Sequence, residues 1–180
     1  MAVLRVLLLI SLVALTAMGQ QKSSRQALER PASCPVTAPP AVPFVPPSAY
    51  ELDDYQKSFW LGTDKLWTAV LKSGVVWGWG PRAPGHENEV QPLTAKTFWA
   101  SVDFNYKEEY PPQLKVTGKR LDGDAPPLLT SQATNAFPGP AAAMLVGVYV
   151  PTPGCWEITG EYRGEKLSYV VWVRPGPISP

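Results

Sequence analysis

The side chains able to act as nucleophile, acid or base are few in this chain, and none stands in a recognised catalytic arrangement. The sequence contains one histidine, His86, in a loop-like segment with Glu87 next to it. A Ser-His-Asp triad would need this histidine, but no Gly-x-Ser-x-Gly elbow or comparable nucleophile setting accompanies it. We therefore interpret His86 as a solvated loop residue and predict that the protein is not an enzyme.

Carboxylates offer the main alternative, because they are paired at several points of the sequence. Glu87 and Glu89 flank Asn88, Glu108 and Glu109 are adjacent, and Asp122-Gly123-Asp124 forms a short acidic turn. A glycosidase needs two carboxyl groups at a defined separation across a cleft, and the sequence defines no such separation. We interpret the glutamates as solvated loop charges and Asp122-Gly123-Asp124 as a turn. A small extracytoplasmic hydrolase acting on envelope polysaccharide through such Glu/Asp pairs stays open as the alternative.

Metal sites are equally unsupported by spacing. The Asp122-Gly123-Asp124 turn lacks the remaining ligands of a calcium loop. Neither cysteine has the close spacing of a zinc or copper motif, and the single histidine adds no second ligand. We therefore expect no metal and no cofactor.

The two cysteines, Cys34 and Cys155, allow only one intramolecular pairing. In an oxidising compartment such a pair is expected to form a disulfide. The bond would tie a proline-rich segment near the N-terminus to a turn late in the chain. Closing so long a loop is worth about 4 to 5 kcal/mol in the chain-entropy picture. The sequence thus predicts a structural disulfide.

The N-terminus has the pattern of a secretory signal peptide, which we place at residues 1–19. A short, positively charged start is followed by an apolar run from Val6 to Ala17 and by small residues that suit cleavage before Gln20. The run is too short to span a bilayer comfortably, and no second long apolar run occurs later in the chain. We expect an extracytoplasmic protein, periplasmic or secreted, without a membrane span after signal cleavage.

Charge composition narrows the class of partner. The chain carries 16 Lys and Arg residues against 15 Asp and Glu residues, with 17% charged residues and no basic run. Nucleic-acid binding therefore lacks its electrostatic basis. We expect a protein or glycan of the cell envelope, recognised by shape, aromatic contact and hydrogen bonds.

Proline content divides the remaining chain. Residues 20–49 are first polar and then proline-rich, with seven prolines between positions 31 and 47. That density excludes helix and central strand and favours an extended, polyproline-like arm. The arm is either a spacer or lies along the domain, and a Cys34–Cys155 bond would require the second arrangement. Residues 50–174 form the predicted domain, and 175–180 form a short tail.

Within that domain, short apolar segments alternate with turn signals. Runs rich in Val, Tyr, Trp and Ile are separated by Pro-Thr-Pro-Gly and Arg-Gly-Glu turns in the last third of the chain. Two earlier runs around Lys72-Ser-Gly74 resemble a hairpin, and a later one suggests a bulge at Gly118. About seven strands predict an all-β, immunoglobulin-like antiparallel β-sandwich. The expected strands are 66–71, 75–79, 96–104, 113–121, 144–151, 152–162 and 166–173.

Tryptophans are numerous, with seven in the chain. By strand parity Trp156 is predicted to be a core residue beside the disulfide. Trp77 and Trp79 lie on one face beside glycines, which is typical of an aromatic platform for a sugar ring or a proline-rich strand. A hairpin packed over the core would have the same pattern. The final strand is apolar on both faces, so it is either covered on both sides or displays a patch.

Three segments carry a resemblance to a protein family. Lys115-Val-Thr-Gly-Lys-Arg-Leu-Asp-Gly123, Pro153-Gly-Cys-Trp-Glu-Ile-Thr-Gly-Glu-Tyr162 and Leu167-Ser-Tyr-Val-Val-Trp-Val173 resemble a "TGxRLDG … PGCWEITGxY … LxFVVxV" pattern. A group of uncharacterised bacterial exported proteins shares this ending. The resemblance implies an exported, immunoglobulin-like domain and transfers no catalytic residue. Taken together, the patterns predict an exported, non-enzymatic binding or envelope-interaction module, and they assign no specific biochemical role.

Overall fold

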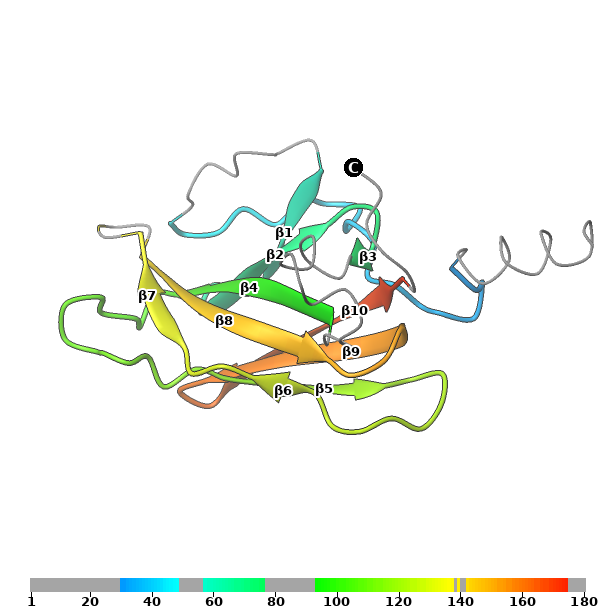
Figure 1. Cartoon of the computed structure of the whole chain (residues 1–180). Coiled ribbons are helices and arrows are strands. Elements are labelled where there is room, and N and C mark those ends of the chain that lie inside the picture. Colours follow the sequence, from blue (N-terminus) through cyan, green and yellow to red (C-terminus); the bar gives the residue numbers. More distant parts are fainter. Residues whose placement is uncertain (1–29, 49–56, 77–92, 138, 140–141, 175–180) are drawn as a thin grey trace, which may run out of the picture. The chain divides into compact units, whose positions relative to one another are not determined.

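The computed structural model describes residues 30–48, 57–76, 93–137, 139 and 142–174 (Figure 1). The chain divides into two compact units, Met1–Pro31 and Ala32–Pro180, and all the strands belong to the second. The predicted signal peptide, the C-terminal tail, His86, Trp77 and Trp79 lie outside the described residues.

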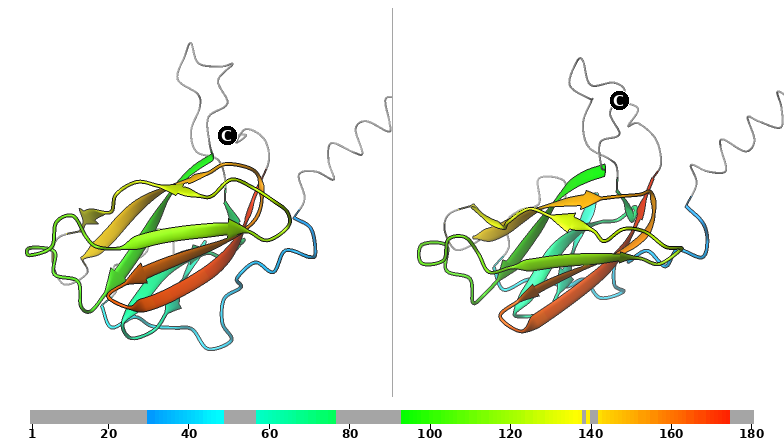
Figure 2. Two further views of the ribbon diagram at one scale, coloured as in Figure 1. Left: turned by 90° about the horizontal axis from the view of Figure 1, so that it is seen from below. Right: turned by 60° about the horizontal axis from the view of Figure 1, so that its bottom comes forward.

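Two sheets lie against each other as layers (Figures 1 and 2). Sheet A has the strand order β1-β2-β4-β8-β6, with β7 also paired to β8, and sheet B has the order β3-β10-β9-β5. Each described pair is antiparallel except β3 with β10. The strands are β1 (Ser58–Gly62), β2 (Leu66–Leu71), β3 (Val75–Val76), β4 (Leu93–Ser101), β5 (Lys115–Arg120), β6 (Leu129–Thr130), β7 (Thr134–Ala136), β8 (Ala143–Val150), β9 (Gly154–Tyr162) and β10 (Glu165–Val173).

The predicted all-β sandwich is therefore confirmed, and no helix occurs in the described ranges. Three short or early strands, β1, β6 and β7, add to the expected set. The C-terminal strands fall where their alternation placed them, because a half-buried strand must repeat with period two.

The predicted hairpin between 66–71 and 75–79 is wrong. Strand β2 pairs with β1 and β4 in sheet A, whereas β3 pairs in parallel with β10 in sheet B. Gly74, with a φ of 62°, carries the chain from one sheet to the other. Its N–H donates to the carbonyl of Leu71, and its own carbonyl accepts from the N–H of Trp172. The glycine correctly indicated a turn, but a turn residue does not determine which strands pair on either side of it.

The predicted bulge at Gly118 is also wrong. Strand β5 stays in register with β9, with Gly118 opposite Ile158. A Cβ at position 118 would lie 2.9 Å from the backbone oxygen of Glu157 and 3.1 Å from the Leu128 side chain. Glycine is therefore required by close approach rather than by a bulge. Leu121 is out of phase because the strand ends at Arg120.

The core between the sheets is aromatic. Trp99 of β4 and Trp156 of β9 are both fully buried, which confirms the prediction for Trp156. Their indole N–H groups donate to Thr97 Oγ1 at 3.0 Å and to the Thr152 carbonyl at 2.9 Å. The Trp99 ring lies against Gly160, where a Cβ would collide with it. Aromatic packing across the two layers thus fixes how closely the sheets approach.

Candidate functional site

The cysteines form the predicted disulfide. Cys34 and Cys155 are bonded, with their Cα atoms 5.6 Å apart, and both are almost completely buried. Trp172 lies opposite Cys155 in the β9–β10 register and covers the bond together with Val36. A formed disulfide fits an oxidising compartment.

The proline-rich arm continues from Cys34 along the edge of β10. The Thr37 N–H donates to the Val170 carbonyl at 2.9 Å, and the Val170 N–H donates to Thr37 Oγ1 at 2.8 Å. Val36 occupies the space beside Gly74, where a Cβ would lie 2.7 Å from the valine Cβ. Figure 2 shows this blue and cyan segment passing β10 on its way to the β1–β2 side. The arm therefore lies on the domain and is not a free spacer.

Beyond Thr37 the arm reaches the outer face of sheet A. There the ring of Phe44 packs on a set of outward-facing residues that we name the arm-covered cluster. The three prolines before Phe44 and the strand β1 enclose a cavity of about 200 Å³. Residues of the cluster are buried or half-buried although they point away from the core. The arm-covered cluster consists of Trp60, Trp67, Phe98 and Ala100.

The rest of the same outer face is not covered by the described part of the arm. Leu129 of β6 and Tyr149 of β8 are cross-strand neighbours, 64% and 37% exposed. The Tyr149 hydroxyl lies 3.6 Å from where Gly147 would carry a Cβ, so the tyrosine leans along its strand. We name Leu129, Leu145 and Tyr149 the open face. Leu145 is half-buried, and the exposed Lys96 lies opposite Gly147 in the β4–β8 register, so a charge stands beside these apolar side chains.

Aromatic rings connect the two halves of this outer face. The ring centroids of Trp60 and Phe98 are 5.7 Å apart, and those of Phe98 and Phe137 are 5.9 Å apart. Phe98 also lies opposite Leu145 in the β4–β8 register. Apolar side chains therefore connect the arm to Leu145 of the open face.

The outer face of sheet B is built differently. Three rows cross its strands, and each places hydroxyl or charged side chains beside one another. Lys166 pairs with Glu161 at 3.2 Å, Lys119 pairs with Glu157 at 3.1 Å, and Thr159 hydrogen-bonds to Ser168 at 2.7 Å. These groups satisfy one another, whereas Val170 and Trp172, further along the same face of β10, pack with Cys34 and Val36 of the arm. The rows are Lys115–Glu161–Lys166, Thr117–Thr159–Ser168 and Lys119–Glu157–Val170.

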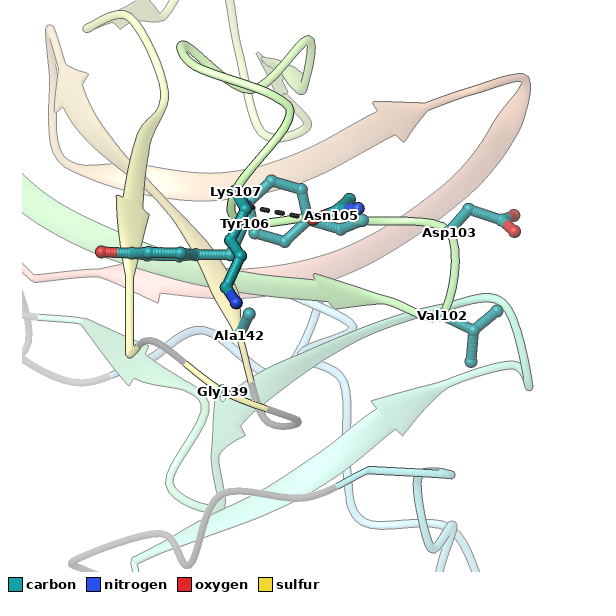
Figure 3. Close-up of a pocket in the computed structure, with 8 residues that line it drawn as sticks. Val102, Asp103, Asn105, Tyr106, Lys107, Gly139 and Ala142 are labelled. Carbon is teal, nitrogen blue, oxygen red and sulfur yellow. Dashed lines mark hydrogen bonds between the residues drawn. The ribbon is translucent and has the colours of Figure 1, made fainter.

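A cleft of about 500 Å³ lies at the loop that follows β4. The predicted strand 96–104 ends at Ser101, and the loop from Val102 to Lys107 forms one side of the cleft. Figure 3 shows Tyr106 and Lys107 on one side and Val102 and Asp103 at the other end of the loop. The Lys107 N–H donates to Asn105 Oδ1 at 3.0 Å, which tightens the turn. No cluster of acid, base and nucleophile lines this cleft among the described residues.

Glu109 anchors this loop, so the prediction of a solvated charge is wrong for it. Its side chain is only 12% exposed. One oxygen accepts from the Tyr162 hydroxyl at 2.6 Å and from Arg163 at 3.0 Å, and the other accepts from the Gln113 N–H at 2.7 Å. Burial alone would raise the pKa of this carboxyl, but the three donors and the arginine charge outweigh it and lower the pKa. Burial and the Glu109 charge in turn raise the pKa of Tyr162.

Asn135 completes the anchor from β7. Its Nδ2 donates to the carbonyls of Tyr106 and Glu109 at 2.9 and 3.0 Å. Two backbone acceptors of the loop are thereby satisfied by one side chain, which holds the loop in a single shape. Asn135 was not singled out from the sequence, because nothing local distinguishes it.

The Asp122 carboxylate is engaged as well. It accepts from Arg120 Nε at 2.6 Å, and Arg120 also reaches Thr152 Oγ1 at 3.4 Å. Burial works to raise its pKa, yet the arginine and a hydrogen bond from the Cys155 backbone leave the pKa lowered. The acidic turn thus braces the β9 end of the sandwich. In the part of the chain that the structure describes, no group of three His, Cys, Asp or Glu side chains is placed to hold a metal ion.

The open face was missed by sequence reasoning. The signal in the sequence is the alternation along β8, in which Leu145, Gly147 and Tyr149 face outward between buried valines. Its partner Leu129 lies in a stretch expected to be irregular, so only the fold brings the two exposed side chains together.

Comparison with known proteins finds no matching family model, no matching curated protein and no matching solved structure. Over the described ranges, no helix is long and apolar enough to cross a membrane.

Proposed function

We propose that this protein is an exported, non-enzymatic binding module that engages a protein or glycan of the cell envelope through the open face of sheet A. The observation that carries the proposal is the contrast between the outer faces. Sheet B pairs its charges and hydroxyls with one another, whereas sheet A leaves Leu129 and Tyr149 in water.

Exposed apolar side chains gathered on one face offer a surface that a partner can cover. Covering on the order of 100 Å² of apolar surface would contribute about 2.5 kcal/mol. Tyrosine is also a frequent anchor, since it offers a large amphipathic ring with few rotatable bonds. The open face therefore has the composition expected of a binding surface.

Two structural roles support a non-enzymatic protein. Glu109 holds a loop and Asp122 braces a strand end, and each already accepts hydrogen bonds from neighbouring side chains. Carboxylates fixed in this way are poor candidates for exchanging protons with a substrate. The disulfide and the leader-like N-terminal run support export.

The predicted platform of Trp77 and Trp79 lies outside the described residues and stays a prediction. If the partner is a glycan, Trp77→Ala or Trp79→Ala should lose glycan retention while the circular dichroism spectrum of the fold is unchanged. Retention at the wild-type level in both variants would remove the platform from the proposal.

The proposal is tested by crosslinking the tagged mature protein in the envelope of its own cell and identifying what is captured by mass spectrometry. The test variant is Leu129→Ser with Tyr149→Ser, and the matched control is Lys119→Ser with Lys166→Ser on sheet B. We expect capture to fall at least about tenfold in the first and to persist in the second, since tenfold corresponds to about 1.4 kcal/mol. Equal capture by both would contradict the proposal, and cleaved glycan would favour the hydrolase.

A further inference from the structure

We infer that the arm-covered cluster is a recognition site for extended proline-rich segments, and that the arm is its built-in occupant. A partner segment of the same chemistry would take the place of the arm. This inference rests on the proposed function, because it concerns the same outer face of sheet A, and it names the class of partner.

The first support is the chemistry already seated on the cluster. Pro39, Pro40 and Pro43 approach β1, and Phe44 packs against Trp60 and its neighbours. A polyproline-type chain presents rigid apolar ridges that dock on aromatic side chains at little conformational cost. The sheet thus already binds one such segment, supplied by its own chain.

The second support is that the arm fills the site incompletely. The cavity of about 200 Å³ remains between its prolines, Phe44 and β1. Val42 and Val45 are 81% and 80% exposed, so the arm directs two of its apolar side chains away from the sheet. A segment not tied to Cys34 is free to choose a register that fills this space.

The third support is an unused hydrogen-bond donor. The indole N–H group of Trp67, in the arm-covered cluster, is buried without a hydrogen-bond partner in the described part of the chain. The Trp67 side chain is more than nine-tenths buried. Carbonyls of a polyproline-type segment have no internal partner and are available as acceptors. A segment in a different register can supply the carbonyl acceptor that the arm does not.

Tethering explains why the arm occupies the site by default. The disulfide and the Thr37–Val170 hydrogen bonds hold the arm beside the cluster, so its effective concentration there is high. The contact of Phe44 with Trp60 lies beyond these attachments. It can therefore open while the disulfide stays intact, and the arm acts as a competitor that weakens the apparent affinity for a partner.

The test uses a fluorescein-labelled peptide with the sequence of residues 38–47, Ala-Pro-Pro-Ala-Val-Pro-Phe-Val-Pro-Pro, and measures its fluorescence anisotropy. It is titrated with the full mature chain as wild type, as Phe44→Ala, and as Cys34→Ser with Cys155→Ser. We expect both variants to bind the peptide at least tenfold more tightly than wild type. A control peptide with alanine in place of its phenylalanine should bind neither.

The Phe44→Ala variant keeps the disulfide, so the test does not depend on folding without it. Absence of binding to a Phe44→Ala protein with the wild-type circular dichroism spectrum would overturn the inference. Equal binding of the control peptide would do the same. Either result would leave the capture experiment with Leu129 and Tyr149 unaffected, so failure of this inference is distinguishable from failure of the proposed function.

Discussion

The two outer faces of this sandwich are built on the same alternating strand pattern, and away from the disulfide they differ in chemistry. On sheet B the outward residues form rows in which Lys166 meets Glu161 and Thr159 meets Ser168. On sheet A the outward residues include Trp60, Phe98 and Tyr149, with the exposed Lys96 among them, and a proline-rich arm covers part of this face. Alternation obliges only the inward residues to be apolar. The two sheets of one sandwich can therefore differ in the chemistry of their outward-facing residues.

The largest expected effect on stability comes from removing the disulfide that holds the arm against the domain. Replacing both Cys34 and Cys155 by serine should lower the free energy of unfolding by about 3 to 5 kcal/mol, because the unfolded chain regains the entropy of a long open loop. Urea unfolding followed by tryptophan fluorescence measures the change. A loss below about 1 kcal/mol would show that the arm contributes little to the fold.

A matched pair of substitutions compares the faces directly. Trp60→Ala on sheet A should cost about 3 kcal/mol, because it leaves a cavity under Phe44. Thr159→Ala on sheet B should cost about 0.5 kcal/mol, since its hydroxyl is exposed and water replaces Ser168. Both are measured by urea unfolding. Similar costs at the two positions would mean that the outer face of sheet A is not packed as described.

Acid is expected to weaken the hydrogen bonds of the Glu109 carboxylate and so to destabilise the protein. The lowered pKa of this carboxyl means that its stabilising contribution is present above the ordinary value of 4.5 and is lost as pH falls through the folded-state pKa. Glu109→Gln should therefore be less stable than wild type, by about 1 to 2 kcal/mol, at pH 7. The difference in stability between wild type and Glu109→Gln should narrow below pH 4.5. Thermal unfolding from pH 3 to 7 measures it, and a gap that is constant with pH would contradict the assignment.

The smallest effect is expected from the charges of sheet B. Lys119→Ala removes a pair with Glu157 in which the lysine side chain is 68% exposed. Exposed pairs of this kind contribute about 0.5 kcal/mol or less, and salt screens them further. Chemical unfolding at low and high salt should show almost no difference from wild type. A loss above about 1 kcal/mol would mean that this face is more than a solvated surface.

Features that depend on local period could be predicted from the sequence. Trp156 points into the core because β9 alternates from that residue on, and the disulfide was expected because the chain has only two cysteines. The C-terminal part of the final strand is covered on both faces, because Val36 packs with Trp172 on its outer side, whereas Lys166 and Ser168 earlier in the strand stay exposed.

The predictions that failed depended on distant partners. Gly74 is followed by a strand that pairs with β10, and no local residue encodes that choice. Glu109 was interpreted as solvated, since its partners Tyr162 and Arg163 lie more than fifty positions away in the chain. The open face forms only when β6 is placed beside β8. Long-range pairing, rather than propensity, decides each of these features.

We propose that sheet A, not sheet B, is the binding surface, and site-specific photo-crosslinking distinguishes the two faces. A photoreactive amino acid is placed at Tyr149 in one protein and at Thr117 in another, and both are irradiated in the producing cell's envelope. We expect a discrete adduct from position 149 and none from position 117. Adducts from position 117 alone, or equally from both, would contradict it.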